Sequence, residues 1–159
     1  MATVKKLGLG DQQYGGFTPA GNVTTYRARL NTNATGAAIG ADSAAALAED
    51  DVVVLEKLPQ GFLLEDAQVI VSTGMTTGVT GSLGFVYVDG VDDATVPQDD
   101  EYFGTGIALA TAARLRTTSS KAPVRLAKEA YLVLTLGGAD NAKASQIDVI
   151  VHGERFGPN

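Results

Sequence analysis

Short stretches in which apolar and polar residues alternate dominate this chain from Val23 onward. In residues 23–30, Tyr26 and Leu30 fall on one side of an extended chain, and Arg27 and Arg29 fall on the other. A period of two residues is typical of a strand with one buried face. The pattern therefore predicts a half-buried strand at the start of the folded region.

The clearest pair of strands meets at the turn formed by residues 58–61, Leu-Pro-Gln-Gly. Val52–Leu55 before the turn is apolar and mostly β-branched, which favours a strand. Pro59 cannot continue a hydrogen-bonded ladder, and Gly61 readily supplies a turn conformation. Phe62–Val71 then resumes the chain as a second strand, so these residues predict two connected strands.

Similar segments recur to the C-terminus and indicate an all-β fold. Residues 31–51 hold too few large apolar residues for a packed helix and predict a long loop, although a capped helical turn at 42–49 remains an alternative. Residues 72–80 predict a turn, Asp89-Gly90 is a favoured hairpin dipeptide, and residues 92–101 predict an acidic loop. Seven or eight short strands with irregular loops predict an antiparallel β-sandwich or jelly roll. The further strands expected are Leu83–Val88, Ile107–Leu115, Val124–Leu126, Ala130–Leu136 and Gln146–Glu154.

The N-terminal segment differs from the rest of the chain. Five glycines lie between residues 7 and 21, which argues against a stable helix or a continuous buried face. We expect residues 1–21 to form an extended glycine-rich arm and residues 22–159 to form a single sandwich domain. Tyr14 and Phe17 are the candidate anchors of this arm on a neighbouring subunit, and a loose terminus is the alternative.

Composition narrows the classes of function. The formal net charge is −6, and such a chain lacks the basic surface from which nucleic-acid binding draws most of its affinity. The absence of cysteine excludes disulfides, thiolate metal sites and cysteine nucleophiles, and it fits assembly in a reducing cytoplasm. No apolar run approaches the roughly 18 residues of a membrane span. We therefore expect a soluble protein with neither nucleic acid nor membrane as a direct partner.

No residue pattern indicates catalysis or a cofactor. His152 is the only histidine, and no Gly-x-Ser-x-Gly motif accompanies it. Residues 89–101 carry six acidic side chains that could bind a hard cation, but the regular spacing of a Ca²⁺ loop is missing. A solvated acidic loop is the preferred interpretation. The sequence thus predicts no enzyme, no cofactor and no metal site.

Charge is segregated along the chain. Residues 89–101 hold only acidic charges, and residues 114–128 hold only basic ones. Complementary charged surfaces steer encounters between molecules and fix their register, although the two segments could also be solvated loops or pair within one subunit. The predicted interface residues are Tyr14 and Phe17 of the arm together with Asp99, Asp100, Glu101, Tyr102, Arg114, Arg116, Lys121 and Arg125.

Several of these segments also carry a family resemblance. Over roughly residues 22–154 the chain resembles the small capsid decoration, or cement, proteins of tailed bacteriophages, which have a jelly-roll fold. The segments that carry the resemblance are the Ala/Gly-rich loop before Asp51, then Asp51–Leu55, the turn at 58–61, Asp66–Val71, Tyr102–Gly106, Ala130–Leu136 and Asp148–Val151.

The resemblance implies a non-enzymatic virion protein without site residues, made in the host cytoplasm. It would bind the outer surface of the phage head as a homodimer or homotrimer and stabilise the shell by bridging subunits of the major capsid protein. The alternative is a carbohydrate- or receptor-binding β-sandwich of a tail or fibre, which would need exposed aromatic side chains. Only Tyr87, Tyr102 and Phe103 are candidates for that role.

Overall fold

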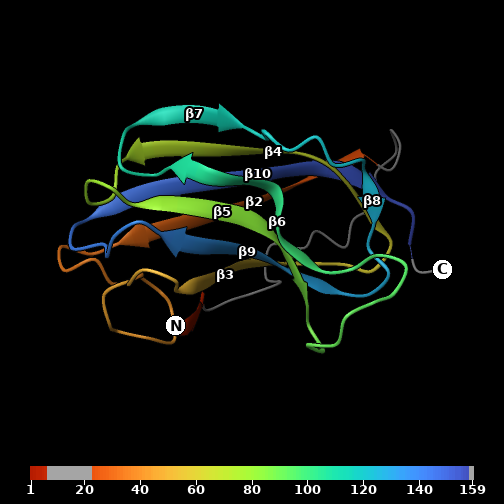
Figure 1. Ribbon diagram of the computed structural model, residues 1–159, viewed down its shortest axis with the longest axis horizontal. Helices are drawn as coiled ribbons and strands as arrows, with labels where there is room; N and C mark the ends of the chain where they lie inside the picture. The colour runs from red at the N-terminus through yellow and green to blue at the C-terminus, as the bar shows by residue number, and fades with distance from the viewer. Residues whose placement is uncertain (7–22, 158–159) are drawn as a thin grey trace.

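The computed structural model describes residues 1–6 and 23–157, and in these ranges two β-sheets pack face to face (Figure 1). None of this described part forms a helix long and apolar enough to cross a membrane. The first sheet contains, in spatial order, β1 (Thr3–Lys5), β3 (Val52–Leu58), β9 (Ala130–Gly137), β5 (Thr80–Tyr87) and β6 (Asp99–Ala108). The second contains β2 (Val23–Thr32), β10 (Ser145–Arg155), β4 (Phe62–Thr73) and β7 (Ala113–Arg116), and β8 (Val124–Arg125) also pairs with β4.

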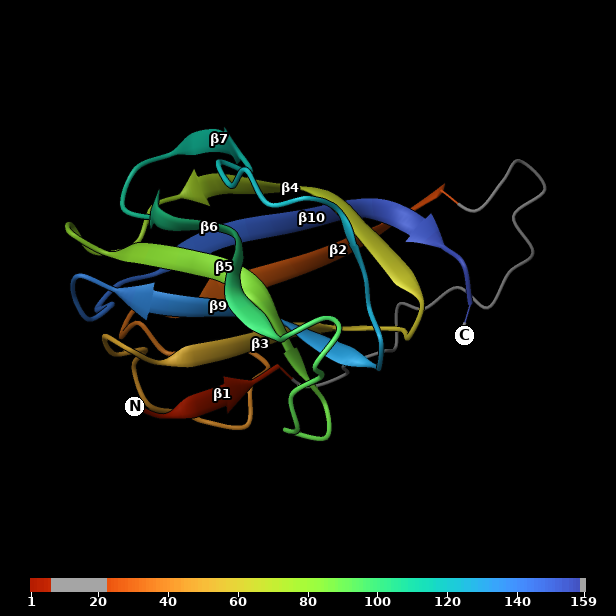
Figure 2. The ribbon, with the colours of Figure 1, turned by 45° about the vertical axis from the view of Figure 1, so that its right-hand side comes forward.

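The chain passes repeatedly between the two sheets. Its route gives the orders β2-β10-β4-β7 and β3-β9-β5-β6, in which neighbouring strands are antiparallel, and β1 adds to β3 in parallel (Figure 2). This is the connectivity of a jelly roll. The predicted all-β antiparallel sandwich is confirmed.

The core lies between the two sheets. Alternate residues of each strand point inward, as Ile147, Val149 and Val151 of β10 do, and these three are fully buried. Tyr26 of β2 and Phe62 of β4 pack edge to face, with ring centroids 5.0 Å apart. Burying one large apolar side chain stabilises a fold by about 1.5–3 kcal/mol relative to leaving it exposed. The sandwich therefore depends on the alternation that the sequence displays.

One end of the sandwich is held by the side chain of Asn141, which is fully buried. Its amide nitrogen donates to Thr32 Oγ1 at 3.1 Å and to the carbonyl of Lys143 at 3.0 Å. Its carbonyl oxygen accepts from the backbone N–H of Thr76 at 3.1 Å. These bonds connect the end of β2 with the β4–β5 and β9–β10 loops, so one buried polar side chain joins three segments.

Two predicted segments are wrong in their boundaries. Residues 107–115 do not form one strand, because β6 ends at Ala108 and β7 begins at Ala113 in the opposite sheet. Leu109 is fully buried between them and bonds through its backbone to Val79 and Met75, so the chain crosses between the sheets at this point. The acidic loop predicted at 92–101 also ends early, since Asp99 already belongs to β6. The alanines and threonines in this segment alternate in the sequence, but such small side chains do not indicate which of the two sheets a strand joins.

The N-terminal residues enter the sandwich. In the predicted arm, 1–21, Thr3–Lys5 forms β1 beside β3, and the backbone N–H of Ala2 donates to the buried carboxylate of Asp51 at 2.8 Å. Tyr14 and Phe17 lie outside the described residues. Asn31 and Thr32 still belong to β2, and residues 33–51 form the predicted loop, with isolated β-bridges and without the alternative helical turn at 42–49.

The turn between β3 and β4 is closed by contacts to two distant segments. Gly61 adopts a φ of 75°, its N–H donates to the carbonyl of Leu126, and its carbonyl accepts from Phe156. A Cβ atom on Gly61 would lie 1.7 Å from the carbonyl oxygen of Gly157. Gly90 has a similar φ of 69°, but nothing lies within 4 Å of the position of its Cβ.

These two glycines provide a matched test of how tightly the turn is packed. Gly90→Ala should lower the free energy of unfolding by about 1–2 kcal/mol, the cost of a left-handed conformation for a residue with a Cβ. Gly61→Ala should lower it by about 3 kcal/mol or more, because the backbone must also move away from Gly157. Urea denaturation of both variants measures the difference. Equal losses would show that the contact between the turn and the C-terminal segment adds nothing to stability.

Candidate functional site: two charged surfaces

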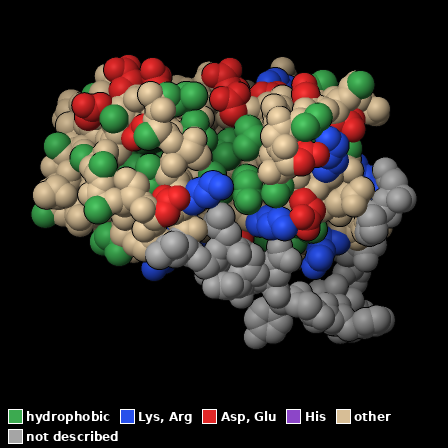
Figure 3. All heavy atoms as spheres, turned by 90° about the horizontal axis from the view of Figure 1, so that it is seen from below, with side chains coloured by type: hydrophobic (Ala, Val, Ile, Leu, Met, Phe, Trp, Pro, Cys, Tyr) green, Lys and Arg blue, Asp and Glu red, His purple; other side chains and the backbone are tan. Residues whose placement is uncertain are grey.

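The acidic and basic segments identified in the sequence fold against each other at one end of the sandwich. Lys121 forms an ion pair with Asp99, and Lys128 Nζ lies 3.0 Å from the carboxylate of Asp89. Figure 3 shows acidic and basic side chains next to one another on one face of the molecule. We call this region, residues 89–101 and 121–128, the charged end. At these four residues the charges pair within one molecule, which is one of the alternatives that the sequence left open.

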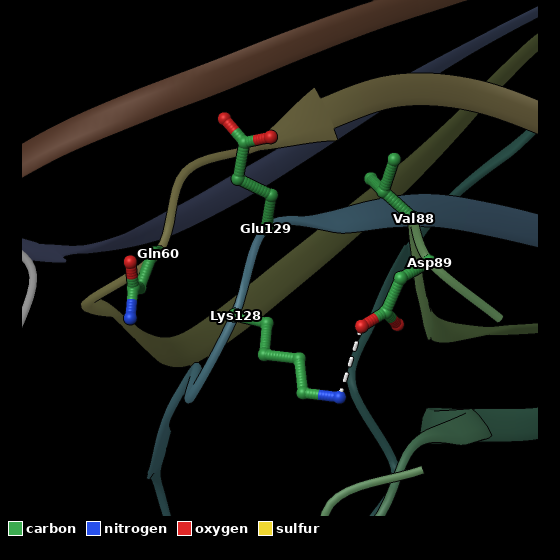
Figure 4. Close-up of a pocket in the computed structure, with 5 residues that line it drawn as sticks. All are labelled: Gln60, Val88, Asp89, Lys128 and Glu129. Carbon is green, nitrogen blue, oxygen red and sulfur yellow. Dashed lines mark hydrogen bonds and ion pairs between the residues drawn. The ribbon is translucent and has the colours of Figure 1, made fainter. Parts of the chain in front are cut away.

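A shallow pocket of about 280 Å³ opens in the charged end (Figure 4). Lys128 points across it toward Asp89, while Glu129 points away from Lys128. Lys128 also donates to the carbonyl of Val91 at 3.1 Å, and Glu129 pairs with Lys57 at 2.7 Å. The ionic groups that line this pocket are thus engaged in contacts within the chain, and their arrangement holds loops together.

The aromatic residues proposed for ligand or partner contact are buried. Tyr102 is 6% exposed, and its hydroxyl donates to the carbonyl of Ala122 at 2.8 Å. Tyr87 is 2% exposed and donates to the carbonyl of Val96 at 2.6 Å, and Phe103 is 1% exposed. Burial raises the pKa of both tyrosine hydroxyls above 10.0, so they stay protonated donors. The carbohydrate-binding alternative needs exposed aromatic side chains, and its three candidates are buried.

The other predicted interface residues take different positions. Asp100 and Glu101 of β6 and Arg114 of β7 are exposed, and Arg114 has no ion-pair partner among the described residues. Arg125 is half-buried, donates to the carbonyl of Gly157 at 2.8 Å and lies over the ring of Phe156. Arg125 therefore holds the C-terminal segment against β8.

A second charged surface covers the outward side of the β2-β10-β4-β7 sheet. Strand register places Arg29, Asp148, Ile70 and Arg114 in one row across the four strands. The neighbouring row consists of Arg27, Ile150, Gln68 and Arg116. We call these eight residues the arginine face. Its edge strands, β2 and β7, carry two exposed arginines each, and its two isoleucines lie on the inner strands.

Beside the arginine face lies a depression of about 320 Å³. Lys6, Arg27 and Arg29 contribute cationic groups to its lining, and Asp148 contributes one carboxylate. Arg29 donates through Nε to Asp148 at 2.8 Å, and its side chain remains 53% exposed. Arg27 has no ion-pair partner in the part of the chain that the structure describes. Among the described residues that line this depression, three cationic side chains therefore accompany one carboxylate.

At the opposite edge of this face, Arg116 is paired with Asp66. Burial of the carboxyl group alone would raise its pKa, but hydrogen bonds from Arg116 and Thr117 hold the pKa of Asp66 below its ordinary value of 3.8. Asp66 is thus a fixed carboxylate at neutral pH. It neutralises one of the four corners of the arginine face.

No catalytic arrangement appears in residues 1–6 and 23–157. The ring Nδ1 of His152 lies 3.3 Å from Thr25 Oγ1, and the carboxylate of Asp66, which is opposite His152 in the strand register, is paired with Arg116. Nowhere in these ranges do three or more His, Asp or Glu side chains gather as metal ligands. The two charged surfaces are therefore the candidate functional sites.

The arginine face was missed at the level of sequence. The alternation in residues 23–30 already placed Arg27 and Arg29 on one side of a strand, and Arg114 and Arg116 alternate in the same way. What the sequence does not contain is the strand order that brings β2 and β7 into one sheet. The pair of arginines can be recognised in each strand separately. The arginine face forms only when β2 pairs with β10 and β7 pairs with β4.

Comparison with known proteins finds matches in three-dimensional structure and none in sequence. No protein-family model matches this sequence, and no curated protein matches it. Among solved structures, a chain of the capsid of Ralstonia phage GP4 matches with a TM-score of 0.66 and 17% identity, over 98% of this chain and 99% of that chain. A chain of the cyanophage Pam1 capsid matches with a TM-score of 0.59 and 12% identity, over 90% and 91%.

A third match is a chain of the acid-stable capsid of Helicobacter pylori bacteriophage KHP30, with a TM-score of 0.50 and 14% identity, over 83% of this chain and 89% of that chain. All three structures are of phage capsids, and in each case most of both chains is aligned. At these identities the similarity establishes a shared fold.

The pair between Asp66 and Arg116 gives a measurable prediction. Arg116→Gln should raise the pKa of Asp66, because the hydrogen bond and the positive charge are lost while burial remains. A depressed carboxyl pKa stabilises the fold above pH 3.8, and this contribution is lost as the pH falls through the folded-state pKa. The variant should therefore lose about 0–1 kcal/mol at pH 7 and depend less on pH in acid.

NMR titration of the Asp66 carboxyl carbon measures this shift directly. Arg114→Gln is the matched control, since Arg114 lies on the same strand two residues away and has no ion-pair partner among the described residues. The control should leave the pKa of Asp66 nearly unchanged. Equal pKa shifts in both variants would mean that the total positive charge of β7, and not the ion pair between Arg116 and Asp66, sets the pKa of Asp66.

Proposed function

We propose that this chain is a virion structural protein of a tailed phage, a decoration or cement protein that binds the outer surface of the head and bridges subunits of the major capsid protein. The observation that carries the proposal is the alignment of 98% of this chain with 99% of a chain in the Ralstonia phage GP4 capsid. Alignment over both whole chains means that the entire sandwich, and not one motif, is shared.

The chemistry of the chain supports a role that depends on contact. In the described residues Lys121 and Lys128 of the charged end pair with Asp99 and Asp89, and no group of three or more His, Asp or Glu side chains could hold a metal ion. A cement protein needs only buried interface, and specific protein contacts typically bury roughly 1,200–2,000 Å² in total. A non-enzymatic structural role agrees with such a surface.

The net charge supports attachment outside the shell. A protein with a formal charge of −6 would be repelled by packaged DNA on the inner side. The proposal includes association of the chain with itself as a homodimer or homotrimer. Repetition over the head would then turn several weak contacts into strong attachment. Synthesis in the host cytoplasm is part of the same proposal.

Co-sedimentation with heads that lack this chain, prepared from the phage that encodes it, tests the proposal. We expect saturable pelleting with a fixed number of copies per head, and a rise in the temperature at which decorated heads release their DNA. An unrelated acidic protein of similar mass should stay in the supernatant. The absence of pelleting at both low and high salt would refute the decoration role.

A further inference from the structure

We infer that the arginine face is the surface by which this chain docks, and that its partner on the phage head is a protein surface rich in carboxylates. The inference rests on the proposed function and names the site and the chemistry of that attachment. Its starting point is the placement of four exposed arginines on one sheet face of a protein whose net charge is −6.

The layout of the face resembles an interface more than an ordinary solvated sheet. Ile70 and Ile150 lie on the inner strands together with Gln68 and Asp148, while the arginines lie on the two edge strands. Specific interfaces commonly have an apolar centre surrounded by polar residues, and arginine is enriched in them. All four cations in the two rows are arginines, whose planar guanidinium groups bind carboxylates through two hydrogen bonds.

Free charge is available on this face. Arg27 and Arg114 have no ion-pair partners among the described residues, and Arg29 uses Nε for Asp148 while its side chain stays 53% exposed. The depression of about 320 Å³ beside the face adds Lys6. An acidic side chain of a partner would find two or three cations in this depression.

The arrangement of charge also distinguishes between two possible partners of the arginine face, a second copy of this chain and a different protein. Face-to-face docking of two copies would bring arginines against arginines, which is unfavourable. Docking on the charged end of a second copy is a weaker alternative. Lys121 and Lys128 pair with Asp99 and Asp89 there, the carboxylates of Asp92 and Asp93 accept backbone hydrogen bonds within their own loop, and Asp100 and Glu101 are left as exposed carboxylates beside these lysines. A separate acidic surface is the complementary partner.

The test compares two double variants in co-sedimentation with undecorated heads. Arg27→Glu with Arg114→Glu reverses the two arginines of the face that lack ion-pair partners, at opposite edges of the sheet. Lys143→Glu with Arg155→Glu changes the net charge equally at exposed positions outside the two rows. Thermal melting checks that both variants fold. We expect the first variant to bind at least about tenfold more weakly and with less dependence on salt, and the control to bind like the wild type.

Each outcome decides a separate question. If the wild type binds and both variants bind equally well, the arginine face is not the docking surface, although the proposed function stands. If both variants lose binding alike, general charge and not this face controls attachment, which also overturns the inference. If the wild type fails to bind heads at all, the proposed function and the inference fail together.

Discussion

The arginine face is positioned by the pairing of β10 with β2 on one side and β4 on the other. The register of these three strands places Val149 in the core and Asp148 on the other side of the sheet, where it pairs with Arg29. Because side chains alternate along a strand, a slip of one residue would expose Val149 and Val151 and bury charges. The cost of that exchange fixes the register. The arginine face is therefore a consequence of the same burial that stabilises the fold.

The two charged surfaces differ in how their charges are used. At the charged end, lysines bind nearby carboxylates and hold the long loop between β5 and β6 against the strands. On the arginine face, Arg27 and Arg114 lack such partners in the described residues. Exposed ion pairs contribute little to stability, about 0–1 kcal/mol each. Unpaired charge on a rigid sheet offers more to a partner than charge already bound within the chain.

Much of the fold could be predicted from the sequence, because large apolar residues alternate clearly in β4, β9 and β10. The crossing at Leu109 could not, since the alanines and threonines around it alternate without a large apolar side chain to indicate direction. The burial of Tyr102 was missed because it depends on carbonyl acceptors at Leu64 and Ala122, which are distant in sequence. Predictions failed where tertiary contacts decided the outcome.

The location of the arginines has a further consequence for a protein made in many copies. β2 and β7 are the outer strands of their sheet, and each exposes one side that could pair with a strand of another molecule. Natural sheets prevent such pairing by placing charged residues on their outer strands. Arg27 and Arg29 on β2, with Arg114 and Arg116 on β7, would repel one another if two copies aligned edge to edge. The same side chains should thus keep the unassembled protein from aggregating at high concentration.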